Sequence, residues 1–124
     1  MNHAVLTVLI SGLLPIACAA IAKWGAKGYD NHNPREWMAR QDGRRARADA
    51  AQQNSLEAFP FFAAAVALAM LRGVDEAAIV QCCWWFVAMR VAYIYCYVTD
   101  RATLRSVVWS LGLAAVIRLY LLAL

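Results

Sequence analysis

Four apolar stretches alternate with polar segments along the chain, at residues 4–22, 50–71, 77–98 and 104–124. Each stretch is close to the ~20 residues that a membrane-spanning helix needs. The polar segments between the last three stretches, "RGVDE" and "TDRATLR", are short enough to be tight turns. The pattern predicts an all-α, integral membrane four-helix bundle, built as a single domain over residues 1–124.

The first stretch, "AVLTVLISGLLPIACAAIA", also has the appearance of a signal peptide. The tripeptide "ACA" at 17–19 resembles a cleavage site, which is typically flanked by small residues. However, residues 1–3 contain no Lys or Arg, whereas a signal peptide carries basic residues before its apolar run. We therefore interpret residues 4–22 as a retained membrane span.

Basic residues are distributed unevenly between the polar segments. The first segment and the residues beside it carry Lys23, Lys27, Arg35, Arg40, Arg44, Arg45 and Arg47. The third carries Arg101 and Arg105, whereas the second balances Arg72 against two acids. Because cytoplasmic loops are enriched in Lys and Arg, loops one and three are expected in the cytoplasm and both termini on the opposite side. Arg118 would lie near that opposite side as a structural residue, where its side chain could extend to the membrane interface or pair with Asp75 or Glu76.

The first polar segment, residues 24–48, is expected to lie outside the hydrocarbon, with a turn at Pro34 followed by a short surface helix that places Trp37 at the interface. Its arginines are not interleaved with aromatic residues, which argues against nucleic-acid binding. They are explained by topology and by contact with anionic membrane lipid.

Composition supports the membrane assignment. The chain is 63% hydrophobic and 16% charged, whereas a soluble domain averages about 45–50% and 25%. The four cysteines all lie in apolar stretches, at Cys18, Cys82, Cys83 and Cys96. None forms a C-x-x-C pair or a metal-type spacing with histidine, so we interpret them as small apolar residues and expect no metal site.

Ionisable groups inside spans usually face the bundle interior and mark function. In the second span, Arg47, Asn54 and Glu57 are separated by seven and three residues, which returns them to one helix face. In the third span, Arg90 and Tyr93 begin a similar stripe, which continues to Tyr97 and Arg101. Glu57 and Arg90 lie at similar depth, so an ion pair between them is predicted.

These side chains, together with Arg105 and Ser106, gather at one depth near the cytoplasmic side. Such a basic, hydroxyl-bearing cluster suits a small ligand with several carboxylates, and an arginine beside a thiol favours the thiolate. The alternative is that the polar groups only hold the helices together, at about 0.6–2 kcal/mol each. That alternative explains Glu57 and Arg90 more readily than the whole cluster.

The stretches "NSLEAFPFF", "RVAYIYCY" and "DRATLRS" resemble the MAPEG family, the membrane-associated proteins in eicosanoid and glutathione metabolism, and more specifically a bacterial-type member. The resemblance extends over about residues 44–110. It implies a homotrimer of four-helix bundles with a glutathione site between neighbouring subunits. Glutathione would be the cosubstrate, and a lipophilic small molecule from the membrane the second substrate.

The resemblance also implies roles for individual residues. Arg105, with Ser106 beside it, would stabilise the glutathione thiolate and is assigned as catalytic. Glutathione binding is assigned to Arg47, Asn54, Glu57, Arg90, Tyr93, Tyr97 and Arg101. The expected function is glutathione-dependent transfer to lipophilic electrophiles, or reduction of peroxides.

One position departs from the family pattern. Many members carry arginine four residues before the asparagine, where this chain has Ala50. A lost carboxylate clamp would weaken glutathione binding by about 1.5–3 kcal/mol. A non-catalytic membrane binding or assembly protein on the same fold is therefore the alternative function. A transporter is less consistent with the chain, which shows neither additional spans nor an inverted repeat.

Overall fold

The computed structural model describes residues 1–124 as five helices without a strand: α1 (Asn2–Lys23), α2 (Pro34–Ala39), α3 (Gly43–Leu71), α4 (Glu76–Val98) and α5 (Ala102–Ala123). The four long helices coincide with the four predicted spans to within a few residues, except at the start of α3. All four are long and apolar enough to cross a membrane. The predicted all-α architecture with four membrane-type helices is therefore confirmed.

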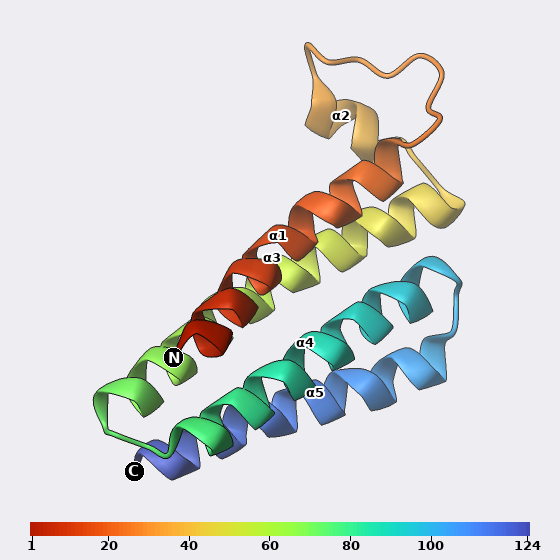
Figure 1. Cartoon of the computed structure of the whole chain (residues 1–124). Helices are drawn as coiled ribbons and strands as arrows, with labels where there is room; N and C mark the ends of the chain where they lie inside the picture. The colour runs from red at the N-terminus through yellow and green to blue at the C-terminus, as the bar shows by residue number, and fades with distance from the viewer.

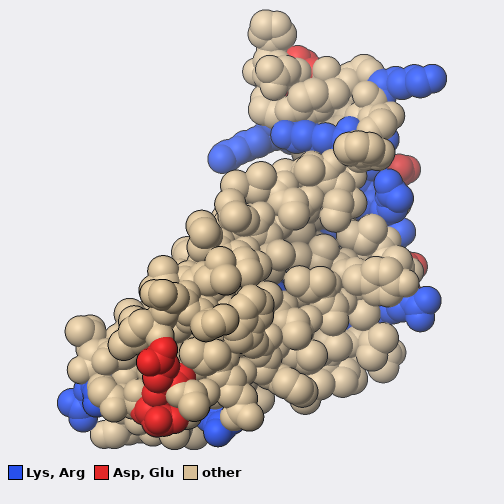
Figure 2. All heavy atoms as spheres, viewed as in Figure 1, with Lys and Arg blue, Asp and Glu red and all other residues tan.

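The helices form two antiparallel pairs, with α1 beside α3 and α4 beside α5 (Figure 1). Contacts of α4 with α1 and α3, and of α5 with α3, join the pairs into one bundle. Both termini and the α3–α4 turn lie at one end, whereas α2 and the α4–α5 turn lie at the other (Figure 1). Most of the visible Lys and Arg residues gather at the α2 end, and a surface with few charged residues separates them from the end of the termini, where an acidic patch lies between basic residues (Figure 2).

Helix α3 begins at Gly43, seven residues before the expected start of the second span. The arginine- and alanine-rich residues 44–51 are good helix formers, which explains the extension. Two of these arginines also bind the ends of other helices: Arg45 donates to the carbonyl of Ala22 at 2.7 Å, and Arg47 donates to that of Val98 at 3.2 and 3.3 Å. The last carbonyls of a helix lack helical partners and carry partial negative charge, so these arginines stabilise the ends of α1 and α4.

The predicted short surface helix is present as α2, and it begins at Pro34 itself, where a turn was expected. Proline suits the first helical position because its fixed φ is compatible with the helix and its missing N–H is not needed there. The ring of Trp37 in α2 packs edge-on against Tyr29, with centroids 4.9 Å apart. The first loop therefore folds back onto α2 above the ends of α1 and α3 (Figure 1).

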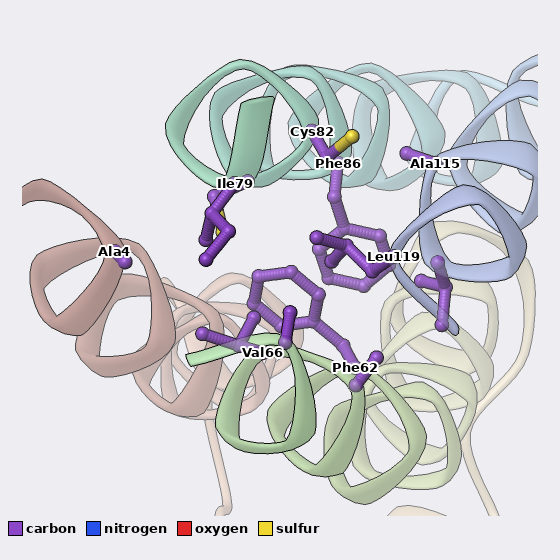
Figure 3. Packing of buried hydrophobic residues seen from close by; sticks show 12 residues of the cluster. Ala4, Phe62, Val66, Ile79, Cys82, Phe86, Ala115 and Leu119 are labelled. Atoms are coloured by element: carbon purple, nitrogen blue, oxygen red, sulfur yellow. The ribbon is translucent and has the colours of Figure 1, made fainter. Parts of the chain in front are cut away.

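An apolar core occupies the half of the bundle nearer the termini. Phe62 of α3 stacks on Phe86 of α4, with ring centroids 4.0 Å apart and an interplanar angle of 16°, and Val66, Ile79 and Leu119 surround the pair (Figure 3). Helices α4 and α5 approach closely beside this core, because a Cβ atom on Gly112 would lie 3.3 Å from the Cβ of Met89. The core sets the relative rotation of α3, α4 and α5, and hence which side chains meet in the other half.

The charged groups near the termini differ from expectation. Arg118 donates to Oε1 of Gln81 at 3.0 Å, and not to an acid. Asp75 accepts a hydrogen bond from the backbone N–H of Ala78 as the N-cap of α4, and Glu76 forms an ion pair with the amino group of Met1. Of the two alternatives for Arg118, the pairing with Asp75 or Glu76 is wrong, because the first turn of α4 uses one carboxylate and the amino group of Met1 the other.

Candidate functional site

Arg90 is the only charged residue among the buried residues of the bundle, with 4% of its surface exposed. Its Nη2 donates to Oγ of Ser55 at 3.0 Å, and its guanidinium lies over the Tyr93 ring at 4.2 Å from the centroid. The chain contains two ion pairs, one between Glu36 and Arg40 and one at the amino terminus, and neither involves Arg90. The predicted Glu57–Arg90 ion pair is therefore wrong.

The geometry of α3 explains this difference. Ser55 and Glu57 are two residues apart and so point about 200° apart around the helix. Ser55 is buried and faces Arg90, whereas Glu57 is exposed. Arg90 and Glu57 line one pocket without forming an ion pair. The guanidinium is thus buried without a neutralising carboxylate from its own chain.

Two arginines and two tyrosines form a stacked row along α4 and the start of α5. Beyond the Arg90–Tyr93 contact, the Tyr93 and Tyr97 rings meet edge-to-face at 5.7 Å between centroids. The guanidinium of Arg105 lies over the Tyr97 ring at 4.3 Å. A cation over an aromatic face is attracted to the ring, more strongly where water is excluded. The Tyr97 ring on α4 therefore holds the guanidinium of Arg105, which lies at the start of α5, in a defined orientation.

A polar pocket of about 390 Å³ opens beside this row, between α3, α4 and α5. Its lining residues are Asn54, Tyr93, Arg105, Ser106, Trp109 and Ser110. The hydroxyls of Ser106 and Ser110 donate to the carbonyls of Ala102 and Ser106 within α5, at 3.3 and 3.0 Å. Their oxygens keep acceptor capacity, and Arg105 supplies the positive charge.

A second pocket, of about 200 Å³, adjoins the polar one. Six of its ten lining residues are hydrophobic, including Phe61, Phe86 and Leu113, and its polar side is formed by Asn54, Glu57 and Arg90. Oδ1 of Asn54 is buried without a hydrogen-bond partner in the chain. An unsatisfied buried acceptor costs about 1–3 kcal/mol, so this position favours a ligand that brings a donor.

The structure brings together most of the residues singled out in the sequence. Those that line one or both pockets are Asn54, Glu57, Arg90, Tyr93, Arg105 and Ser106. Tyr97 lines neither pocket but contacts Arg105. Arg47 is engaged by the end of α4, and Arg101 is exposed, with its guanidinium 5.9 Å from the centroid of the Tyr95 ring.

Three contributing residues were not anticipated: Ser55, Trp109 and Ser110. Trp109 and Ser110 lie one helical turn after Arg105 and Ser106, so the helical period could have placed them on the same face. Ser55 carried no such signal. It lies on a different face of α3 from Asn54 and Glu57, and its role depends on the reach of Arg90 from another helix.

The fold and the pockets define a multi-helix membrane-type protein with a basic, hydroxyl-lined site at one end of the bundle, next to an apolar pocket. The family model described as MAPEG family matches residues 3–124, which is nearly the entire chain. The chain therefore belongs to the MAPEG family, as its motifs indicated. Searches of curated proteins and of solved structures found no significant match.

Proposed function

We propose that this protein is a glutathione-dependent transferase or peroxidase that acts on lipophilic electrophiles. Membership of the MAPEG family suggests a role in glutathione or eicosanoid metabolism. The observation that carries the more specific proposal is the charge of the site. A buried guanidinium without a carboxylate partner and a second guanidinium, Arg105, lie along two adjoining pockets.

Glutathione complements these groups chemically. It carries two carboxylates, one ammonium group and a thiol. The carboxylates match the positive charge of Arg90 and of the basic end of the bundle, and the ammonium group matches Glu57. An N–H group of the tripeptide would satisfy Oδ1 of Asn54, which has no donor in the chain. The thiol would then lie near Arg105 and Ser106.

Arg105 would favour the thiolate over the thiol, because a nearby cation lowers a thiol pKa. The thiol proton leaves to solvent. In conjugation, the thiolate sulfur attacks the electrophilic carbon, a C–S bond forms, and the leaving group departs with its electron pair. In peroxide reduction, the sulfur attacks one peroxide oxygen and the O–O bond breaks. The resulting alkoxide takes a proton to become an alcohol, and a second glutathione converts the sulfenic acid to the disulfide and water.

The proposed assembly is a homotrimer embedded in lipid, with loops one and three in the cytoplasm. In that arrangement the pockets lie toward the cytoplasmic end, where glutathione is available, while the lipophilic substrate arrives from the bilayer. Arg47 and Arg101 lie outside both pockets in a single chain. They would contribute to glutathione binding only where one subunit meets another.

The second candidate function is a non-catalytic membrane binding or assembly protein. Ala50 favours it, because a small apolar side chain stands where many family members have arginine. The positive charges of Arg90 and Arg105 favour the enzyme instead, since contacts with Ser55 on α3 and Tyr97 on α4 could join the helices without two cations.

The proposal is tested by adding glutathione to the purified, detergent-solubilised protein and following the ultraviolet absorbance of the thiolate near neutral pH. A saturating rise is expected. S-Methylglutathione, which has no ionisable thiol, is the matched control and should bind without a rise. If S-methylglutathione binds but glutathione gives no thiolate, the protein is a binding protein. If neither ligand binds, glutathione chemistry is excluded.

A change at Tyr97 tests whether the stacked row orients Arg105. Tyr97→Leu removes the ring under the guanidinium and is expected to lower kcat/KM about 3- to 10-fold, in line with the loss of one cation–π contact. Tyr97→Phe keeps the ring and should retain near wild-type kinetics with a model electrophile. Equal losses in both variants would show that the hydroxyl matters, and not the stack.

A further inference from the structure

Arg118 is a cation without a counterion on an exposed part of α5, near the end of the bundle that holds the termini. Helix α5 contains no acidic residue, and neither ion pair of the chain involves Arg118. The two acids at the start of α4 are engaged elsewhere, Asp75 by the N–H of Ala78 and Glu76 by the amino group of Met1. A positive charge in a membrane-type helix is thus left for a partner from outside the chain.

The contact between Arg118 and Gln81 gives this position the character of a donor site. Oε1 of Gln81, on α4, accepts from Nη1 of Arg118 at 3.0 Å, and both side chains are exposed. The guanidinium and the amide carry further N–H donors beyond this bond, whereas the oxygen of the amide is engaged by the arginine. The pair therefore combines a positive charge with several donors, which suits an anion.

We propose that Arg118 and Gln81 bind the phosphate of an anionic phospholipid of the phosphatidylglycerol type, in the membrane leaflet at the end of the termini. Phosphate oxygens match the planar fork of a guanidinium, and the amide adds a donor. A choline or ethanolamine headgroup would bring a cation for which no free carboxylate is available beside the phosphate. Neither residue lines the two pockets, so the site is independent of the proposed glutathione function.

The position of the pair along the helices fits the level of lipid headgroups. Arg118 lies five residues before Ala123, where α5 ends, and Gln81 lies five residues after Glu76, where α4 begins. At about 1.5 Å per residue, both are roughly 7–8 Å from the ends of their helices. A long arginine side chain can extend over such a distance to the membrane interface. The guanidinium can therefore meet a phosphate there.

Apolar surface for an acyl chain continues from the pair toward the middle of the bundle. Trp85 lies one turn after Gln81 on the same face of α4, and its indole N–H donates to the carbonyl of Leu111 on α5 at 3.1 Å. Leu111 lies two turns before Arg118 on the same face of α5. Both Trp85 and Leu111 are exposed. The tryptophan thus bridges α4 and α5 where the acyl chain of a lipid held at Arg118 would lie, and tryptophan suits the membrane interface.

The test is native mass spectrometry of the detergent-solubilised full chain, titrated with phosphatidylglycerol or phosphatidylcholine of identical acyl chains. The wild type is expected to retain phosphatidylglycerol at least about fivefold more tightly, as for one cation at a membrane surface. Inorganic phosphate at matched ionic strength is the third arm. It should not displace the lipid, because it has no acyl chains to pack on Trp85.

Two variants locate the site. Arg118→Gln removes the charge and is expected to retain one phosphatidylglycerol fewer per chain, or to bind it about fivefold more weakly. Gln81→Glu places a carboxylate beside Arg118 and should cause the same loss, while thermal unfolding stays at or above the wild-type temperature. The second variant thus separates lipid binding from a role of Arg118 in folding, and provides a measurement should Arg118→Gln fail to fold.

The matched control is Lys27→Gln, which removes one exposed positive charge from the loop between α1 and α2, at the other end of the bundle. It should retain lipid as the wild type does at the Arg118 site. An equal loss in this control would overturn the inference, because the attraction would then be general. Equal wild-type retention of the two lipids, or unchanged retention in both variants, would overturn it as well. Displacement by inorganic phosphate would assign the site to a free anion instead of a lipid.

Discussion

Replacement of Arg105 with alanine is expected to abolish the thiolate absorbance of bound glutathione and to lower kcat/KM by about 100-fold or more, the usual effect of removing a group that stabilises developing or existing negative charge at a reaction centre. Arg105 is the only basic residue of the polar pocket. Its guanidinium is held over the Tyr97 ring and so does not rely on the ligand for its orientation. The measurement combines thiolate absorbance with initial rates toward a small electrophile.

Two further variants test whether the effect depends on the planar guanidinium of Arg105 and is specific to this position. Arg105→Lys keeps a positive charge but loses the planar group that stacks on Tyr97, so an intermediate loss is expected. Arg40→Ala removes an arginine that is paired with Glu36 on the surface of α2 and should behave as the wild type. Wild-type absorbance in Arg105→Ala would contradict the role of Arg105 and leave thiol activation to another group.

The second large effect is expected at Arg90. Arg90→Met is expected to weaken glutathione binding about 10- to 100-fold, which corresponds to one charged hydrogen bond. At the same time, the free energy of unfolding should change little. The variant loses a hydrogen bond to Ser55, about 1.5–3 kcal/mol, and a desolvated cation–π contact, about 2 kcal/mol. It also removes a buried charge without a counterion, whose desolvation costs several kcal/mol.

Calorimetric titration with glutathione and thermal unfolding in detergent separate the two effects at Arg90. Ser55→Ala is the matched control, because it removes the hydrogen-bond acceptor but keeps the cation. It should bind glutathione more tightly than Arg90→Met. If Arg90→Met instead retained wild-type affinity and unfolded more easily, Arg90 would be a packing group, and the helix-holding interpretation of the polar cluster would be correct.

Removal of Glu57 is expected to affect ligand binding and to leave the stability of the bundle nearly unchanged. An ion pair with Arg90 would have made Glu57→Ala strongly destabilising, because it would leave a buried charge unpaired. In the structure Arg90 already lacks a carboxylate partner and is held by Ser55 and Tyr93. Glu57 is exposed on the pocket side of α3, so its contribution is expected in ligand binding and not in the stability of the bundle.

Much of the fold followed from local sequence patterns. Four uncharged or sparsely charged stretches of about twenty residues specify four long helices, because a buried backbone in lipid must satisfy its own hydrogen bonds. The spacing of Asn54 and Glu57 correctly placed both on the pocket side of α3. The spacing from Arg90 through Tyr93 to Tyr97 predicted a stripe that the structure shows as a stacked row. In each case the helical period of one segment was sufficient.

The partners across helices were decided only by tertiary structure. Arg90 meets Ser55 and not Glu57, Arg47 binds the end of α4 and not the pocket, and Trp109 lies between two pockets. A periodic pattern determines which residues of one helix share a face, but not how that helix is rotated against its neighbours or how far a long side chain reaches. The packing of Phe62 on Phe86 and the close approach at Gly112 set those rotations. The sequence by itself thus determined the helices and the kind of chemistry, and the packing between helices determined which groups meet.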